Sequence, residues 1–177
     1  MLLILGLGNP EKKYESTRHN AGFFILDKIK ERWKLPDFKF NKKINAQISK
    51  GKIEDKEITL IKPETFMNLS GESARKALAF WKLAPKDIMV IHDDIDIPLG
   101  KYKIARDSRS AGHNGVQNII DALGTQKFTR LRIGIKNTDL NFKISPEDFV
   151  LQKFSDKERL EIEKISSGFL QEIIKII

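Results

Sequence analysis

The sequence predicts an α/β fold with a largely parallel sheet, formed by a single domain over residues 1–177. Segments with the pattern of strands and segments with the pattern of helices alternate along the whole chain, which is typical of this fold class. The chain has 177 residues, 40% of them hydrophobic and 32% charged, which suits one domain with a full apolar core. No repeat, low-complexity tract or linker-like stretch divides it.

The expected strands are short apolar runs bounded by turn residues. They cover residues 2–6, 45–52, 57–62, 88–92, 100–106 and 130–135. Residues 53–56 join the second strand to the third, and Glu54 and Asp55 suit a tight turn. These two strands should therefore form a hairpin.

The expected helices show apolar side chains at intervals of three to four residues and recognisable ends. They cover residues 20–34, 70–82, 114–123, 146–152 and 156–175. Ser70 and Asn114 are the predicted N-caps of the second and third helices, and Gly124 would end the third. Ser155 and Glu158 have the spacing of a capping box at the start of the last helix.

The charge of the chain favours a polyanionic partner such as nucleic acid. Its 32 Lys and Arg against 24 Asp and Glu give a net charge of +8. The absence of cysteine excludes disulfides, thiolate nucleophiles and thiolate metal sites. The sequence shows no secretion signal and no apolar run of the roughly 18 residues that a membrane helix needs, so we expect a cytoplasmic protein without a membrane partner.

Four polar segments interrupt the alternation of strands and helices. Three directly follow expected strands and the fourth leads into a helix, so they should gather at the edge of the sheet where parallel strands end. The segments are GLGNPEKKYESTRHNAG (6–22), KPETFMNLSG (62–71), HDDIDIPLG (92–100) and AGHNGVQNI (111–119). The side chains brought together would be Asn9, His19, Asn68, Asp93, His113 and Asn114.

The first segment lacks the fingerprint of a dinucleotide-binding loop. That fingerprint needs a third glycine at the start of a helix, whereas Pro10 and Glu11 follow here. We therefore expect Gly6 and Gly8 to let backbone and ligand approach each other closely.

His19 and Asp93 have the chemistry of a general base and of the carboxylate that orients it. A neutral imidazole can take a proton from water at neutral pH, and a carboxylate on its other nitrogen fixes the tautomer. No serine or cysteine stands in a nucleophile turn, so the attacking group would be water. Side-chain amides of asparagine could hold a peptide backbone and stabilise the oxyanion of a tetrahedral intermediate.

Several of these residues also have a purely structural interpretation. Asn68 and Asn114 fit helix caps, and a cap can still contact a ligand. His113 fits a residue that lines the site as well as one that holds its loop. His92 is expected to be structural, because strand alternation sends it and Asp93 to opposite faces.

Asp93, Asp94 and Asp96 have the ligand type that Mg²⁺ prefers. The other polar segments contain single glutamates but no second cluster of carboxylates to complete a site. We therefore expect no metal and no other cofactor.

Five motifs, in one order, resemble those of bacterial peptidyl-tRNA hydrolases, which are monomeric esterases that free peptides from tRNA. The resemblance runs from Leu3 to about Phe154. It implies a twisted, mixed sheet flanked by helices and hydrolysis of the ester between peptide and tRNA in N-blocked peptidyl-tRNA. The motifs are GLGNP-x3-Y-x2-TRHN-x-G, KP-x-TFMNLSG, HDD-x-D-x-P-x-G, GHNG and RLRIGI.

Carried over residue by residue, the resemblance implies that His19 is the general base and that Asp93 keeps it in its basic form. Asn9 would distinguish N-blocked from free aminoacyl-tRNA. The residues that would contact the 3′ end of the tRNA and the nascent peptide are Tyr14, Phe66, Asn68 and Asn114.

The resemblance also implies a basic grip on the acceptor stem and its 5′ phosphate. Arg132 matches one of the family's basic positions, but Ala105 stands where the other basic residue is common. Lys103 or Arg106 would then take its place. Recognition should depend on phosphates and shape, because an enzyme that serves many tRNAs cannot read one base sequence.

Three stretches depart from the family pattern, and two other functions stay open. Glu11 replaces a glycine, ARDSRS at 105–110 replaces a glycine-rich stretch, and KNTDLN at 136–141 replaces a Gly-x-Pro turn. The alternatives are a non-catalytic RNA-binding protein on the same scaffold and a hydrolase of a non-RNA ester or amide.

Overall fold

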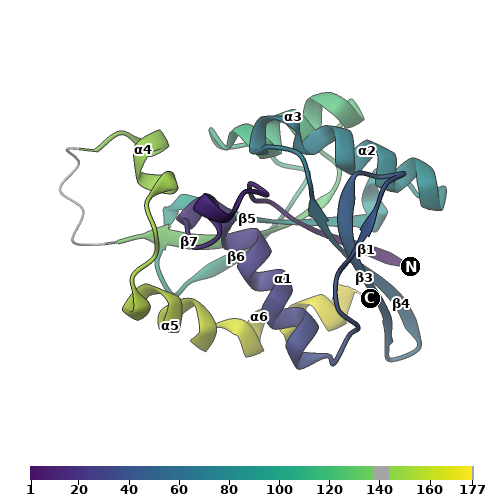
Figure 1. Ribbon diagram of the computed structural model, residues 1–177, viewed down its shortest axis with the longest axis horizontal. Coiled ribbons are helices and arrows are strands. Elements are labelled where there is room, and N and C mark those ends of the chain that lie inside the picture. The colour runs from purple at the N-terminus through teal and green to yellow at the C-terminus, as the bar shows by residue number, and fades with distance from the viewer. Residues whose placement is uncertain (138–143, 177) are drawn as a thin grey trace.

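The structure, a computed structural model, describes residues 1–137 and 144–176. Within them, the strands form one sheet of order β2-β3-β4-β1-β5-β7-β6 (Figure 1). The mixed α/β sheet is as the sequence predicts: β4, β1, β5 and β7 run parallel in the centre, and antiparallel pairs lie at both edges. The strands are β1 Leu2–Gly6, β2 Lys39–Asn41, β3 Ala46–Ile53, β4 Lys56–Pro63, β5 Ile88–Pro98, β6 Tyr102–Arg106 and β7 Thr129–Lys136.

Helices cover both faces of the sheet, with an apolar core on each side. Helices α1, α5 and α6 pack on one face, and α2 and α3 on the other (Figure 1). The α-helices are α1 Ala21–Arg32, α2 Ser70–Trp81, α3 Asn114–Leu123, α4 Pro146–Leu151, α5 Asp156–Lys164 and α6 Ser166–Ile176. Short 3-10 helices are η1 Lys12–Tyr14, η2 Arg18–Asn20, η3 Met67–Leu69 and η4 Pro85–Asp87. None of the helices in the described ranges combines the length and apolar character that crossing a membrane would need.

The predicted hairpin is confirmed as the β3–β4 pair. Glu54 and Asp55 have φ angles of 46° and 64°, so both turn residues are left-handed. This conformation gives a two-residue turn whose twist matches that of the flanking strands.

The structure corrects several predictions about the elements. The helix expected over 156–175 is two helices, α5 and α6, that meet at Ile165; Ser166, Ser167 and Gly168 follow this break and are weak helix formers. Ser70 does not cap α2, because its hydroxyl donates to the carbonyl of Met67 and the N-cap is Leu69. Strand β2 was missed because three residues at a sheet edge carry no alternation to detect.

Strand β5 continues six residues beyond its predicted end at His92. Asp93 and Asp94 are therefore strand residues, paired with Ile133 and Gly134 of β7, and not loop residues as expected. Their carboxylates are buried against cationic or hydrogen-donating side chains, which lets polar residues extend a strand.

The topology sets the position of the site. β1 lies between β4 and β5 and is parallel to both, so the chain segments that follow these three strands leave the sheet at the same edge. In open α/β sheets, the crevice at such a point is where ligands bind.

Candidate active site

A cavity of about 720 Å³ lies at the carboxyl ends of β1, β4 and β5. Residues 146–151 of α4 contribute part of its wall, including Val150 and Leu151. Its lining brings together seven residues that the sequence predicts for the site: Asn9, His19, Phe66, Asn68, Asp93, His113 and Asn114. A second cavity of about 450 Å³ adjoins it at Asn9, and the described lining of that cavity contains no histidine.

Close packing of α1 on the strand ends carries His19 to its place. A Cβ atom on Gly22 would lie 2.5 Å from the carbonyl oxygen of Ile91, and one on Gly6 would lie 2.5 Å from that of Gly22. The ring of Phe23 packs on Gly8 in the same way. Gly6 and Gly8 therefore allow close packing of α1 on the strand end. This corrects the expectation from sequence that they allow the close approach of a ligand.

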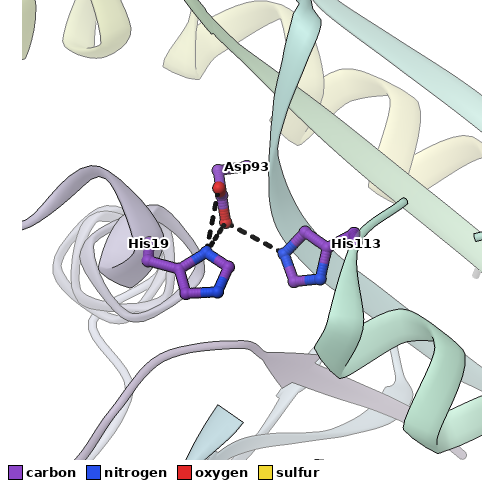
Figure 2. A group of neighbouring side chains, drawn as sticks. All are labelled: His19, Asp93 and His113. Atoms are coloured by element: carbon purple, nitrogen blue, oxygen red, sulfur yellow. Dashed lines mark hydrogen bonds and ion pairs between the residues drawn. The ribbon is translucent and has the colours of Figure 1, made fainter. Parts of the chain in front are cut away.

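His19, Asp93 and His113 form a hydrogen-bonded triad across the sheet edge (Figure 2). His19 Nδ1 lies 3.0 Å from both Oδ1 and Oδ2 of Asp93, and His113 Nε2 lies 3.0 Å from Oδ1. Figure 2 shows the two imidazoles on either side of the carboxylate. The Asp93 side chain is 2% exposed, whereas that of His19 is 13% exposed.

The hydrogen bonds assign the tautomers of both imidazoles. His113 is the N-cap of α3, in place of the predicted Asn114, and its Nδ1 accepts from the Val116 backbone N–H. Its Nε2 must then carry the proton and donate to Asp93. The ionised Asp93 can only accept, so His19 also donates to it from Nδ1. A neutral His19 therefore keeps its lone pair on Nε2.

The pKa values follow from this arrangement. Burial alone would lower the pKa of His19, but the charge and the hydrogen bond of Asp93 outweigh it and raise the pKa above its ordinary value. Burial would likewise raise the pKa of Asp93, yet the two imidazoles hold it far below the usual range of a carboxyl group. Asp93 is therefore ionised at neutral pH.

The same three residues are the one group among the described residues whose ligand atoms lie close enough to hold a metal ion. The tautomer of His113 argues against such a role. Its Nε2 carries a proton that faces the carboxylate, and moving that proton to Nδ1 would break the cap of α3. Asp94 accepts from Arg132 Nε at 2.6 Å, which leaves no carboxylate cluster for Mg²⁺ there.

The third histidine, His92, lies beneath this triad. Neighbouring residues of β5 alternate between the two cores, so His92 and Asp93 lie on opposite faces as predicted. The ring of His113 nevertheless contacts both of them: its centroid lies 4.7 Å from that of His92, and its Nε2 bonds Asp93. His92 Nδ1 donates to the Asp93 carbonyl oxygen at 2.6 Å. Burial, followed by the neighbouring His113, holds the pKa of His92 well below its ordinary value. His92 is thus a neutral packing partner of His113.

Asn9 presents a hydrogen-bond donor to the cavity. Its backbone exchanges two hydrogen bonds with the side chain of Asn20, at 2.8 and 2.9 Å. Its Oδ1 accepts from the Met67 backbone N–H at 2.9 Å, which identifies the other end of the amide as Nδ2. Because Nδ2 makes no hydrogen bond within the described part of the chain, it is available to a carbonyl oxygen of a ligand.

The other predicted contacts divide into two groups. Phe66 and Asn68 flank the buried Met67 and are exposed in the cavity wall, as is Asn114 at the first position of α3. Tyr14 belongs to η1, where Lys13 Nζ lies 4.9 Å above its ring, and it is not part of the described lining of the cavity.

Arg132 and Lys103 lie together, whereas Arg106 points elsewhere. Lys103 of β6 is directly opposite Arg132 of β7, so both side chains lie on the face that α3 covers. Arg106 is three residues farther along β6 than Lys103 and therefore lies on the other face, with the core residues Tyr102 and Ile104. The sequence left Lys103 and Arg106 equivalent, and the register favours Lys103 as the neighbour of Arg132.

Sequence reasoning missed a buried ion pair next to the proposed base. Arg18 donates to Glu158 at 2.8 Å, and the two side chains are 8% and 6% exposed. Arg18 also lies over the ring of Phe149 in α4, and its backbone N–H bonds the carbonyl of Gln152. The pair therefore ties the turn that carries His19 to the helix that walls the cavity. The TRHN motif contains Arg18, but nothing in the sequence pairs it with a residue 140 positions away.

Replacing Glu158 with alanine should destabilise the protein strongly. The substitution leaves the buried Arg18 unpaired and removes half of the capping box at α5, so we expect a loss of about 3–5 kcal/mol in the free energy of unfolding. Urea unfolding measures it. The matched control is Glu161→Ala, whose partner Lys164 is exposed and which should cost at most about 1 kcal/mol. Equal losses in the two variants would contradict a structural role for the buried pair.

Comparison with known proteins agrees with this geometry. The family described as peptidyl-tRNA hydrolase matches residues 3–177. The peptidyl-tRNA hydrolase of Brevibacillus brevis is 44% identical over 167 residues, which cover 94% of this chain and 86% of the relative. That of Thermodesulfovibrio yellowstonii is 41% identical over 179 residues, covering 100% and 92%. The crystal structure of peptidyl-tRNA hydrolase from Acinetobacter baumannii is similar with a TM-score of 0.89 and 30% identity, covering 99% of this chain and 88% of that one.

Proposed function

Because the chain belongs to the peptidyl-tRNA hydrolase family, we propose that it hydrolyses the ester between peptide and tRNA with a water molecule that His19 activates. The relatives are named as enzymes of this kind, and the chain is an enzyme of the same family. The observation that carries the proposal is the bond of His19 Nδ1 to the buried Asp93, which leaves Nε2 as a base in a cavity lined with amides.

The proposed reaction proceeds through a tetrahedral intermediate. His19 Nε2 takes a proton from water as the water oxygen attacks the ester carbonyl carbon. Asp93 stabilises the imidazolium that forms, and an asparagine amide of the cavity stabilises the oxyanion. When the intermediate collapses, the bond to the terminal ribose oxygen breaks and the imidazolium returns its proton to that oxygen. The products are the peptide carboxylic acid, which releases its proton to solvent at neutral pH, and tRNA with an intact 3′ end.

The donor on Asn9 gives a physical reason for preferring N-blocked substrates. A blocked α-amino group carries an amide carbonyl that can accept from Asn9 Nδ2, whereas a free α-ammonium group offers only donors. A site that places a donor there should bind the first and gain no hydrogen bond from the second. The non-catalytic alternative has less support, because both the base and its orienting carboxylate are present and bonded.

We expect the wild-type enzyme to hydrolyse N-acetyl-aminoacyl-tRNA and to leave the unblocked aminoacyl-tRNA nearly intact. Asn9→Ala should lower kcat/KM for the blocked substrate about tenfold, the effect of one lost hydrogen bond, and should not change the slow reaction of the unblocked one. Release of the amino acid from both substrates, measured side by side, tests this.

Asn9→Asp sharpens this test. The carboxylate keeps the bond to the Met67 N–H but presents an acceptor where the amide presented a donor. The preference for the blocked substrate should therefore fall further than in Asn9→Ala. Undiminished selectivity in both variants would remove Asn9 from substrate discrimination.

The basic pair at the β6–β7 edge should bind a phosphate group of the tRNA. Lys103→Gln is expected to weaken binding of deacylated tRNA and to reduce the slope of log affinity against log salt concentration by about one unit. Arg106→Gln, on the other face, is the control and should leave the slope unchanged. The opposite pattern would assign the phosphate contact to Arg106.

A further inference from the structure

Arg130 is a buried arginine close to the site that the proposed mechanism does not use. It is the second residue of β7 and is 1% exposed. One nitrogen of its guanidinium group, Nη2, donates to the carbonyl oxygens of Ser108 and Arg109 at 2.9 and 2.8 Å and also contacts the Ser108 hydroxyl. All three acceptors belong to the loop between β6 and α3.

Arg130 differs in its surroundings from Arg132, two residues farther along the same strand. Arg132 pairs with Asp94 and is partly exposed. Arg130 makes no ion pair with any described residue, and its Nε and Nη1 are buried without a hydrogen-bond partner among those residues. Burial also denies it contact with a phosphate of the substrate. Since burying an unpaired cation is costly, the loop oxygens are its main compensation.

The loop that Arg130 holds has an unfavourable backbone conformation. Asp107 and Ala111 have φ angles of 45° and 52°, in the left-handed region that side chains other than glycine rarely adopt. Such a conformation persists when contacts from the surrounding structure fix it. The loop then leads directly into His113, which caps α3 and bonds Asp93, and into Asn114 in the cavity wall.

We propose that Arg130 is a positioning residue for hydrolysis, which clamps the loop over residues 107–112 so that His113 reaches Asp93. The inference rests on the proposed function, since it acts through the partner of the base. Arg130 and Arg132 then have different roles on one strand. Arg130 fixes the loop that carries His113, and Arg132 is available to the tRNA.

Position on the sheet supports this assignment. Arg130 pairs with Val90 of β5, two residues before His92, and lies on the face of the sheet that α3 covers. His92 packs against His113 on that face. The segment from Ser108 to His113 therefore lies between two fixed points, the guanidinium at one end and the Asp93 and His92 contacts at the other.

Arg130→Lys is the principal test, because lysine keeps the charge but its ammonium nitrogen is one bond nearer to the backbone than the Nη2 that donates to the loop, and should fall short of the loop oxygens. We expect kcat on N-acetyl-aminoacyl-tRNA to fall about 10- to 100-fold, the effect of a small misplacement in a site. Affinity for deacylated tRNA and its salt dependence should not change. The acid limb of the pH–rate profile should move to higher pH, as in His113→Ala, because an Asp93 that has lost one donor holds the proton of His19 more tightly.

A double-mutant cycle separates positioning from a general structural role. If Arg130 acts through His113, the variant with both Arg130→Lys and His113→Ala should be no slower than His113→Ala alone. Arg109→Ala is the matched control, since Arg130 bonds the backbone carbonyl of Arg109, which the substitution keeps, and kcat should stay at the wild-type level. Ser108→Ala removes one acceptor and should lower kcat about 2- to 10-fold, which keeps the test open if Arg130→Lys does not fold.

Three outcomes would overturn the inference. The first is a wild-type kcat in both folded Arg130→Lys and Ser108→Ala. The second is a double variant, Arg130→Lys with His113→Ala, whose loss of kcat equals the product of the two single losses. The third is an Arg130→Lys enzyme with reduced tRNA affinity and unchanged kcat. Failure of the proposed function would look different, because His19→Ala would then keep its activity whatever the loop variants do.

Discussion

His19→Ala is expected to hydrolyse N-acetyl-aminoacyl-tRNA about 10²–10⁴-fold more slowly than the wild-type enzyme, the contribution of a positioned general base. The structure gives the reason. Nε2 of His19 is the basic nitrogen that the triad leaves without a proton. The two other histidines of the chain both donate to Asp93, His113 to its carboxylate and His92 to its backbone carbonyl. No neighbouring imidazole can replace it. Single-turnover hydrolysis at saturating enzyme measures the chemical step.

Two further measurements distinguish a loss of the chemical step in His19→Ala from a loss of tRNA binding. Binding of deacylated tRNA should remain nearly unchanged, because the predicted phosphate contacts lie on β6 and β7. Imidazole added to the His19→Ala enzyme should restore part of the rate, since the cavity of about 720 Å³ is open to a molecule of that size. Activity at the wild-type level, or a loss explained by weaker tRNA binding, would exclude His19 as the base.

Local patterns were sufficient to predict most of the fold. Buried parallel strands read as apolar runs, and the hairpin, the capping box at Ser155 and the end of α3 at Gly124 each carry a local signature that the structure contains. The errors occur where tertiary contacts override the local pattern. β5 continues through Asp93 because imidazoles satisfy its carboxylate, and the helix expected over 156–175 divides at Ile165, three residues before the close approach of Gly168 to Tyr102.

The sequence was sufficient to predict which residues line the site, but not which hydrogen bonds join them. Polar residues after parallel strands identify Asn9, His19 and Asp93 as neighbours, since such strands end at one edge. The sequence cannot tell that His113 caps α3 with Nδ1, although this bond fixes which nitrogen faces Asp93. The sequence also cannot pair Arg130 with a loop 22 residues away. The guanidinium donates to backbone carbonyls, which every residue type has, so the accepting residues show no recognisable pattern.

The position of Asp93 between two imidazoles makes its substitution especially informative. In Asp93→Asn, the carboxamide offers one acceptor and one donor in place of two acceptors. His113 cannot change its tautomer without losing the Val116 bond, so it keeps the acceptor. His19 must then accept from the amide through Nδ1 and carry its proton on Nε2. The substitution therefore removes the lone pair that attacks water, and we expect a loss on the order of 10⁴-fold in kcat, as for the equivalent change in a serine protease triad.

The pH dependence separates this mechanism from a simple loss of charge. In the wild-type enzyme, Asp93 raises the pKa of His19, so the rate should fall as the pH drops through a value above the ordinary 6.5 of histidine. Without the carboxylate, burial is left to lower that pKa, and the acid limb should move to lower pH. At neutral pH, the Asp93→Asn enzyme would thus hold more neutral His19 than the wild type and still be slower. Asp96→Asn, which replaces an exposed carboxylate of the same strand, should preserve both the rate and the profile. If Asp93→Asn keeps the wild-type acid limb, Asp93 does not govern the protonation of His19 and the proposed pairing is wrong.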